Sequence, residues 1–306
     1  MPSKAKTENQ SSLFDDEGNR IELPLPRDGG AMTAADAYDL GWLHSKHASK
    51  MVSGSTITIA DLFSGCGGLS LGLQEAAYAT GSNSDFLLAA DLEADYLDVY
   101  DKNLKPKHVL NGPIENFVDS PLNSVASEAE RKIQKLISNL NILIAGPPCQ
   151  GHSDLNNYTR RSDPKNDLYA RVARVAELVE PEHVIIENVP GVRHDKSQVM
   201  QRTIEALQCQ GYCVDVATID GARIGVPQRR RRTFVVASLS SSIEEGGLET
   251  FLQSINLQPR TVGWGIGDLL DIETASPFDQ TSELSAESRR RVNWLFDNNA
   301  HDLPDE

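Results

Sequence analysis

The sequence predicts an α/β fold built on a doubly wound, mostly parallel sheet with an antiparallel last strand. From Thr56 onward, short apolar runs typical of buried strands alternate with segments of helical periodicity. Glycine-rich or polar residues follow several of these runs, at the strand ends where open α/β sheets bind ligands. No helix is expected between the last two strands, which favours an antiparallel pairing there.

The predicted elements follow one another in regular alternation. Strands are assigned to short runs of aliphatic and β-branched residues, and helices to stretches with apolar residues three and four apart, such as Ile133, Leu136 and Ile137. The expected strands are 57–62, 86–90, 108–110, 141–145, 183–187, 212–219 and 233–238. The expected helices are 69–77, 94–103, 128–138, 168–179, 198–210, 248–255 and 285–296.

Three regions are expected along the chain. Residues 1–50 are polar, with clusters of Pro, Gly and Asp, and are interpreted as a flexible N-terminal extension with a short helix near 34–45. Residues 51–240 carry the alternating pattern of the α/β domain. The pattern weakens over 241–306, which we interpret as a separate region.

The composition indicates a globular chain without membrane or export signals. The 306 residues are 39% hydrophobic, which suits one large or two smaller domains. There is no apolar stretch of eighteen residues and no apolar segment near the N-terminus, so no membrane helix and no signal peptide are expected, and a cytoplasmic location is predicted. The net charge of −15 disfavours nucleic-acid binding by the surface as a whole, although arginines cluster at 229–232 and 289–291.

The four cysteines are expected to be reduced thiols rather than metal ligands. They stand in dissimilar contexts, at Cys66, Cys149, Cys209 and Cys213. The last two form a CxxxC pair, but no second pair of ligands follows, so no metal site is predicted.

The segment from Asp61 to Ser70 joins a strand to a helix through three glycines. Glycines let the backbone approach a ligand closely, and the start of a helix offers free N–H donors. Ser70 replaces the last glycine of the dinucleotide fingerprint, so the methionine carboxylate of S-adenosylmethionine suits these donors better than a pyrophosphate. The alternative is a tight strand–helix turn without a ligand.

Asp91 ends the second strand, at a place where an acid binds ribose hydroxyls. Leu92 next to it could cover one face of an adenine ring. The alternative is a solvated carboxylate at a strand end.

Cys149 and Glu187 end two further strands. Pro147 and Pro148 stiffen the loop before Cys149, as expected for an aimed nucleophile, although an ordinary turn is an alternative. A carboxyl group at Glu187 could bind the exocyclic amine and ring nitrogen of a base, and a helix cap or a turn is its alternative. The two strands are expected to be neighbours.

The run from Gln228 to Arg232 enters the last strand. Strand alternation sends Gln228, Arg230 and Arg232 to one face and the two intervening arginines to the other. One set could therefore face a site, while a plain basic surface run is the alternative.

Taken together, these segments resemble the DNA (cytosine-5) methyltransferases, in the motif order of that family, from about Thr56 to Ser238. The resemblance implies a Rossmann-like methyltransferase sheet, S-adenosylmethionine as cofactor and double-stranded DNA as partner, as in restriction-modification. The cofactor residues that it implies are Asp61, Phe63, Ser64, Gly65, Cys66, Gly67, Gly68, Leu69, Asp91, Leu92, Ile114, Pro147 and Leu168.

The resemblance also implies a mechanism in which the target cytosine leaves the helix stack. Cys149, as thiolate, attacks C6, and Glu187 holds N3 and the amino group. Arg232 and Arg230 hold the cysteine and the base, and C5 then takes the methyl group.

The chain departs from the family pattern at two places. Pro113 stands where an acid often contacts the adenine amine, so that Glu115 or Asn111 would make this contact. After Ser238 no late motif is found, and 241–306 is expected to be the start of an incomplete target-recognition region. The alternatives are a catalytically incomplete cofactor-binding fragment, or a split half that needs a C-terminal partner. The tRNA-acting branch is disfavoured because its Cys-Phe-Thr segment is missing.

Overall fold

The computed structural model describes residues 10–14, 20–24, 39, 41, 54–148, 168–194, 198–240, 243–255, 257, 259–267 and 283–300. The chain divides into two compact units. One unit contains residues 32–260, and the other contains 1–31 together with 261–306.

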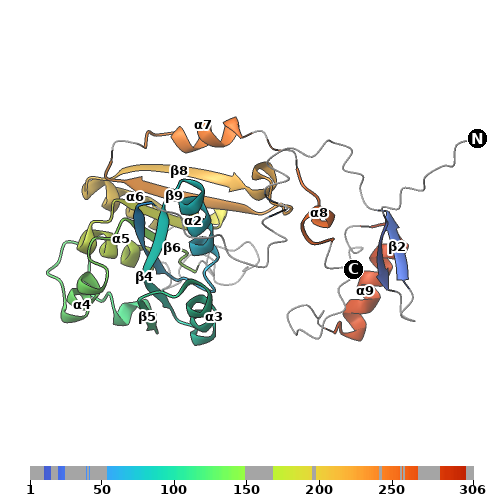
Figure 1. The fold of residues 1–306 in the computed structure, drawn as a ribbon, viewed down its shortest axis with the longest axis horizontal. Coiled ribbons are helices and arrows are strands. Elements are labelled where there is room, and N and C mark those ends of the chain that lie inside the picture. The colour runs from blue at the N-terminus through green and yellow to red at the C-terminus, as the bar shows by residue number, and fades with distance from the viewer. Residues whose placement is uncertain are drawn as a thin grey trace, which may run out of the picture. The chain divides into compact units, whose positions relative to one another are not determined.

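A seven-stranded sheet organises the larger unit (Figure 1). Its order is β5-β4-β3-β6-β7-β9-β8, in which the first five strands are parallel and β9 is antiparallel to both of its neighbours. The strands are β3 (Thr56–Leu62), β4 (Asn83–Asp91), β5 (His108–Asn111), β6 (Ile142–Ala145), β7 (His183–Asn188), β8 (Cys213–Asp220) and β9 (Arg231–Ser238). The predicted fold class is confirmed.

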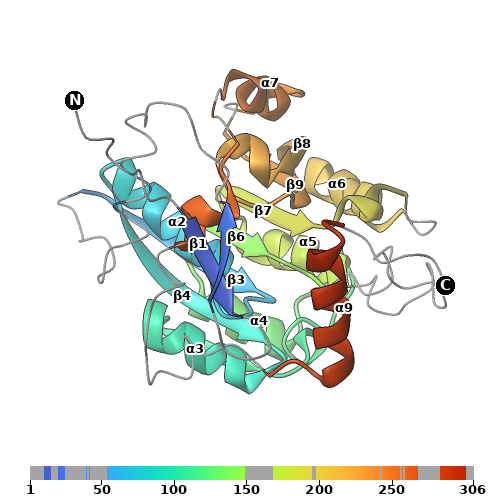
Figure 2. The ribbon, with the colours of Figure 1, turned by 90° about the vertical axis from the view of Figure 1, so that its right-hand side faces the viewer.

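Helices cover both faces of this sheet (Figures 1 and 2). Side chains alternate along β3, so Ile59 faces one core cluster while Ala60 and Leu62 face the other. The cluster of Ile59 is closed by α2 (Gly68–Ala79) and α3 (Ala94–Leu104). The opposite cluster is closed by α4 (Glu128–Leu136), α5 (Leu168–Val179) and α6 (Val199–Cys209).

The segment after the sheet is fixed at two points. At the start of α7 (Gly247–Ser254), the carboxylate of Asp215 accepts the N–H groups of Gly246, at 3.0 Å, and Leu248, at 2.8 Å. Burial alone would raise the pKa of Asp215, but these backbone donors lower it overall. Further along, Arg260 donates to the carbonyl of Gly225 at 3.2 Å and pairs with Asp39 at 2.7 Å.

In the smaller unit, β1 (Gln10–Phe14) and β2 (Arg20–Pro24) pair as an antiparallel ribbon. This unit also contains α8 (Val262–Ile266) and α9 (Ala286–Asp297). The sequence did not predict β1, β2 or α8. The helix expected near 34–45 lies mostly outside the described residues, and the three expected regions stay predictions.

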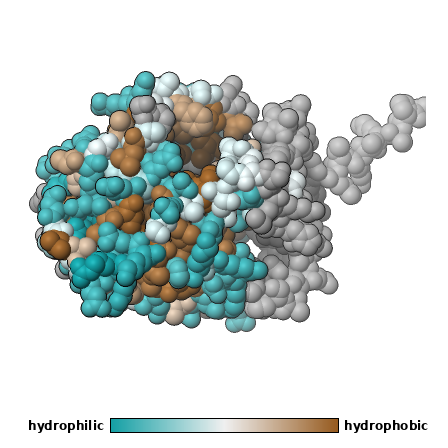
Figure 3. Space-filling model, turned by 60° about the vertical axis from the view of Figure 1, so that its left-hand side comes forward, coloured by the Kyte–Doolittle hydropathy of each residue, from teal (hydrophilic) through white to brown (hydrophobic). Residues whose placement is uncertain are grey.

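Apolar and hydrophilic residues are interspersed on the face of the molecule shown in Figure 3. None of the helices in the described ranges is both long and apolar enough to cross a membrane.

Candidate active site

The glycine loop between β3 and α2 depends on backbone conformations that glycine adopts most easily. Gly65 and Gly67 have φ of 52° and 90°. A Cβ added at Gly67 would lie 2.7 Å from Leu104 Cδ1 and 2.9 Å from Tyr100 Cδ2, so no side chain fits there. Phe63 also has a positive φ, of 58°, which is unusual for a bulky residue and typical of loops that hold ligands. Among the described residues no side-chain cap is found at the start of α2, so its first N–H groups are available to a ligand.

A buried hydrogen-bond chain lies under this loop. Ser70 on α2 donates to Asp61 Oδ2 at 2.6 Å, and Tyr100 OH on α3 lies 2.7 Å from the Ser70 hydroxyl. All three residues are at least 98% buried. Burial, with a smaller contribution from the Asp91 charge, raises the pKa of Asp61 from 3.8 to about 7, against the lowering effect of the Ser70 hydrogen bond.

Asp91 connects the end of β4 to the same loop. Its Oδ2 accepts the N–H of Gly65 at 2.8 Å, and its Oδ1 accepts the N–H of Glu93 at 3.0 Å. Leu92 is 61% exposed, as a residue that covers a ligand ring should be before binding. Asn111 donates to the carbonyl of Leu92 at 2.9 Å, so its amide group already has a partner. Which residue contacts the adenine amine stays a prediction.

The loop after β6, which contains Pro147 and the predicted nucleophile, begins beside the glycine loop, because β6 lies between β3 and β7. Gly146 donates to the carbonyl of Leu62, and the carbonyl of Pro147 accepts Asn188 Nδ2 at 3.0 Å. Cys149 lies outside the described residues, which reach Pro148 at this point. Its role therefore stays a prediction, but β6 and β7 are neighbours, as expected.

Glu187 and Arg232 form the centre of the described site. Arg232 Nε lies 2.6 Å from Glu187 Oε1, and the two side chains are 23% and 28% exposed. A Cβ added at Gly146 would lie 4.0 Å from Glu187 Oε2 and 3.8 Å from the carbonyl oxygen of Phe63. The carboxylate of Glu187 thus lies near both the glycine loop after β3 and the loop after β6.

The other members of the arginine run precede the strand. β9 starts at Arg231, and the N–H of Arg230 donates to the carbonyl of Gln228 in the preceding turn. Strand alternation therefore applies to Arg231 and Arg232 but not to Gln228 or Arg230. The structure brings Arg232 to Glu187, while Arg230 is exposed.

Ile114 and Leu168 are 6% and 7% exposed and belong to the core cluster against which Phe63 packs. Their contact with a cofactor stays a prediction.

Ser64 supplies a test of whether these residues suit the implied cofactor. It is 8% exposed, and its hydroxyl oxygen is buried without a hydrogen-bond partner among the described residues. Buried hydroxyl groups normally have a partner. A polar ligand at the loop would supply one, so the hydroxyl of Ser64, the N–H groups of α2 and the acid Asp91 fit a nucleoside with an amino-acid end.

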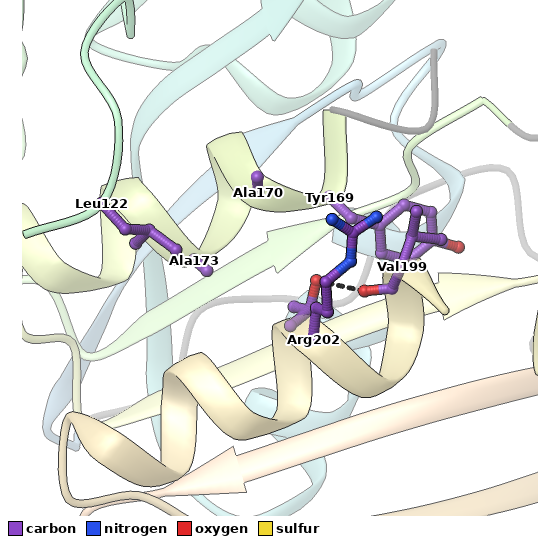
Figure 4. A pocket seen from close by; sticks show the side chains of 7 residues that line it. Leu122, Tyr169, Ala170, Ala173, Val199 and Arg202 are labelled. Atoms are coloured by element: carbon purple, nitrogen blue, oxygen red, sulfur yellow. Dashed lines mark hydrogen bonds between the residues drawn. The ribbon is translucent and has the colours of Figure 1, made fainter. Parts of the chain in front are cut away.

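A separate cavity of about 150 Å³ lies between α5 and α6 (Figure 4). Its lining is mainly apolar, and it also includes Arg202 and Tyr169. Sites for nucleoside-sized ligands usually have at least about 300 Å³, so this cavity is too small for such a cofactor. None of its lining residues is a predicted site residue.

Two side chains that support the site, Asn188 and Tyr100, were not predicted from the sequence. Asn188, which holds Pro147, follows Glu187 directly, so its position beside a predicted site residue was an available signal. Tyr100 contacts the glycine loop from α3, thirty residues away from Ser70, and no local pattern marks that contact.

The seven-stranded, mostly parallel sheet with its antiparallel β9 has the architecture expected for a Rossmann-like methyltransferase, and comparisons with known proteins agree. The Type II methyltransferase M1.BsuMI of Bacillus subtilis (strain 168) is 42% identical over 270 residues, which are 88% of this chain and 62% of that protein. The Type II methyltransferase M1.HphI of Haemophilus parahaemolyticus is 31% identical over 215 residues, 69% of this chain and 52% of that protein. This chain thus spans less than two thirds of either relative.

Residues 57–294 match the model of the C-5 cytosine-specific DNA methylases, and the chain belongs to this family. Solved structures share the fold. The S. pombe Dnmt2 methyltransferase superposes with a TM-score of 0.51 at 17% identity, covering 72% of this chain and 61% of that chain.

Proposed function

We propose that this chain carries the catalytic part of a DNA (cytosine-5) methyltransferase, which transfers a methyl group from S-adenosylmethionine to C5 of cytosine in double-stranded DNA. The observation that supports this proposal most directly is the Glu187–Arg232 pair. It stands beside the Pro147 loop and the glycine loop, at one edge of the sheet, in a chain of the cytosine-specific family.

The cofactor supplies an electrophilic methyl group, and the protein prepares the base to accept it. In the proposed reaction, the thiolate of Cys149 adds to C6 of a cytosine that has left the stack, which makes C5 nucleophilic. Glu187 holds N3 and the exocyclic amine, and Arg232 offsets the charge that develops. After methylation, C5 loses its proton and the bond between Cys149 and C6 breaks.

We also propose that Arg232 orients the carboxylate of Glu187 through their ion pair. A carboxylate that binds the edge of a base must keep a fixed orientation, and the 2.6 Å contact with Nε orients that of Glu187. The antiparallel pairing of β7 with β9 creates this contact, because it places the start of β9 beside the end of β7.

Unpaired arginines near this edge support DNA as the substrate. Arg223, Arg229, Arg230 and Arg231 are exposed, or largely so, and none forms an ion pair with a carboxylate within the part of the chain that the structure describes. Some exposed cations elsewhere do pair with carboxylates, among them Lys102, Lys107, Lys132 and Arg291. In a chain with a net charge of −15, arginines without acidic partners suit contacts with phosphates.

The proposal is tested by trapping the covalent intermediate. Duplex DNA that contains 5-fluorocytosine should form a stable adduct with the wild-type chain in the presence of S-adenosylmethionine, because fluorine at C5 blocks the last elimination. Cys149→Ser should form no adduct, and Cys209→Ser serves as the control for loss of a thiol.

An adduct with Cys149→Ser would contradict the role of Cys149. Binding of S-adenosylmethionine without any adduct would favour the alternative, a cofactor-binding chain that needs a C-terminal partner. Incorporation of labelled methyl groups into tRNA rather than DNA would overturn the choice of substrate.

A further inference from the structure

Tyr100 on helix α3 packs against the glycine loop. The residue is 0% exposed, and its ring packs edge-on against Phe86, with 6.1 Å between centroids and an interplanar angle of 87°. A Cβ at Gly67 would lie 2.9 Å from the ring, so the ring and the loop are in direct contact. The position of this ring therefore limits where the backbone of Gly67 can lie.

The hydroxyl of Tyr100 acts on the loop through a second residue. Ser70 has one hydroxyl hydrogen, which it donates to Asp61 Oδ2 at 2.6 Å. At the 2.7 Å contact between the two hydroxyl groups, Tyr100 is then the donor. The chain of donors runs from α3 through α2 to β3, and each bond in such a chain strengthens the next.

The glycine loop is thus held at two points, by Asp91 at the end of β4 and by Tyr100 on α3. At the first point, the carboxylate of Asp91 accepts the N–H of Gly65 at 2.8 Å. At the second point, the hydroxyl of Tyr100 is linked to Asp61 by hydrogen bonds through Ser70. Asp61 and Ser70 bracket the whole loop, so their separation sets the shape in which Gly65 and Gly67 present the backbone.

We propose that Tyr100 is a positioning residue for S-adenosylmethionine, whose hydroxyl holds the glycine loop in its binding shape through Ser70 and Asp61. The inference rests on the proposed function, since it assigns the loop to that cofactor. Tyr100 itself is fully buried, so its proposed effect on the ligand is indirect, through the loop.

A second buried tyrosine, Tyr212, provides the control that distinguishes positioning of the glycine loop from a general contribution to stability. Tyr212 is 4% exposed, and its hydroxyl donates to the carbonyl of Pro181 at 2.7 Å. Tyr100→Phe and Tyr212→Phe each remove one hydroxyl group and one short buried hydrogen bond. Both should lower the melting temperature, but only the first bond leads to the glycine loop.

Calorimetric titration with S-adenosylmethionine measures the difference. Tyr100→Phe should raise the dissociation constant by about three- to tenfold, the effect of one hydrogen bond, while Tyr212→Phe stays within about twofold of wild type. Equal dissociation constants for Tyr100→Phe and wild type would overturn the inference and leave the proposed function intact. If wild type itself does not bind the cofactor, the proposed function fails, and the inference fails with it.

The chain of hydrogen bonds from Tyr100 through Ser70 to Asp61, here called the relay, allows a stricter test of the inference. Ser70→Ala removes the middle link and should weaken binding at least as much as Tyr100→Phe does. The double variant should then bind no more weakly than Ser70→Ala alone. Additive losses would show that the tyrosine acts independently of Ser70 and would refute the relay.

Discussion

Asp61 and Asp91 end neighbouring strands, but their surroundings differ. Asp91 is half-buried and accepts two backbone N–H groups, from Gly65 and Glu93. Asp61 is 2% exposed and accepts one hydroxyl, from Ser70. The poorer solvation of Asp61 raises its pKa to about 7, so this carboxyl is partly protonated at neutral pH.

Asp61→Asn should change how stability depends on pH. The pKa of Asp61 is raised on folding, so its contribution to stability is fully present below about pH 4 and is lost as pH rises through 7. The free energy of unfolding of wild type should fall relative to that of the variant between pH 4 and 8, by on the order of 4 kcal/mol. Urea titrations of both proteins at several pH values measure this difference, and parallel curves would contradict it.

At the scale of elements, α4 and α5 are joined by a buried ion pair. Arg174 donates to both carboxylate oxygens of Glu130, at 3.1 and 2.7 Å, and to Glu177 at 2.8 Å. Glu130 also accepts the N–H groups of Ser120 and Ser127. Burial opposes ionisation, but these donors together lower the pKa of Glu130 to about 2. Its stabilising contribution is therefore present above about pH 4.5 and is lost as pH falls through 2.

Arg174→Met should destabilise the protein by about 3–5 kcal/mol, because the carboxylate of Glu130 would remain buried without its charged partner. Arg131→Met on the exposed side of α4 is the control and should change stability by about 0.5 kcal/mol or less. Denaturant titration at neutral pH compares the two. A small effect at Arg174 would mean that water reaches Glu130 when the arginine is removed.

The elements that the sequence predicted are those with a strong local pattern. The helix expected at 168–179 coincides with α5, and the other predicted boundaries differ from the structure by no more than three residues. The ribbon β1–β2 was missed because its strands, QSSLF and RIELP, are of mixed polarity and lack the apolar runs of the predicted strands. Helix α8 was missed because its five residues include two glycines, which disfavour a helix.

The candidate site was predictable as a set of residue types at strand ends, but its contacts were not. The pairing of Glu187 with Arg232 depends on β9 lying antiparallel beside β7, which places residues forty-five positions apart in contact. The bond from Asn188 to Pro147 and the relay from Tyr100 to Asp61 also join separate elements. Local periodicity carries no information about such contacts between elements.

At the scale of the whole molecule, the charge is unevenly distributed. The chain has 44 acidic and 29 basic residues, but four successive arginines precede or open β9. An acidic surface repels DNA at long range, so the approach of DNA should depend on this cluster.

Replacing Arg223, Arg229 and Arg231 with glutamine should weaken DNA binding and reduce its dependence on salt. Each lost phosphate contact lowers the slope of log K against log salt by about 0.9. Fluorescence anisotropy with duplex DNA at several salt concentrations measures the slope, and cofactor binding should not change.

The matched control replaces three exposed lysines elsewhere, Lys102, Lys132 and Lys135, with glutamine. It makes the same change in net charge. An equal loss of slope in both triple variants would show that total charge, rather than the arginine cluster, governs the interaction.

The direction of β9 also decides where the chain goes after the sheet. β9 starts beside Glu187 and ends at Ser238, at the opposite edge of the sheet. Asp215 fastens the next helix near that far edge, and Arg260 fastens the chain again at Gly225, in the turn before β9. The segment between these two attachments therefore connects one end of the strands to the other. It returns the backbone at Arg260 to the turn before β9, so the last residue of the larger unit is held at the same end of the sheet as the Glu187–Arg232 ion pair.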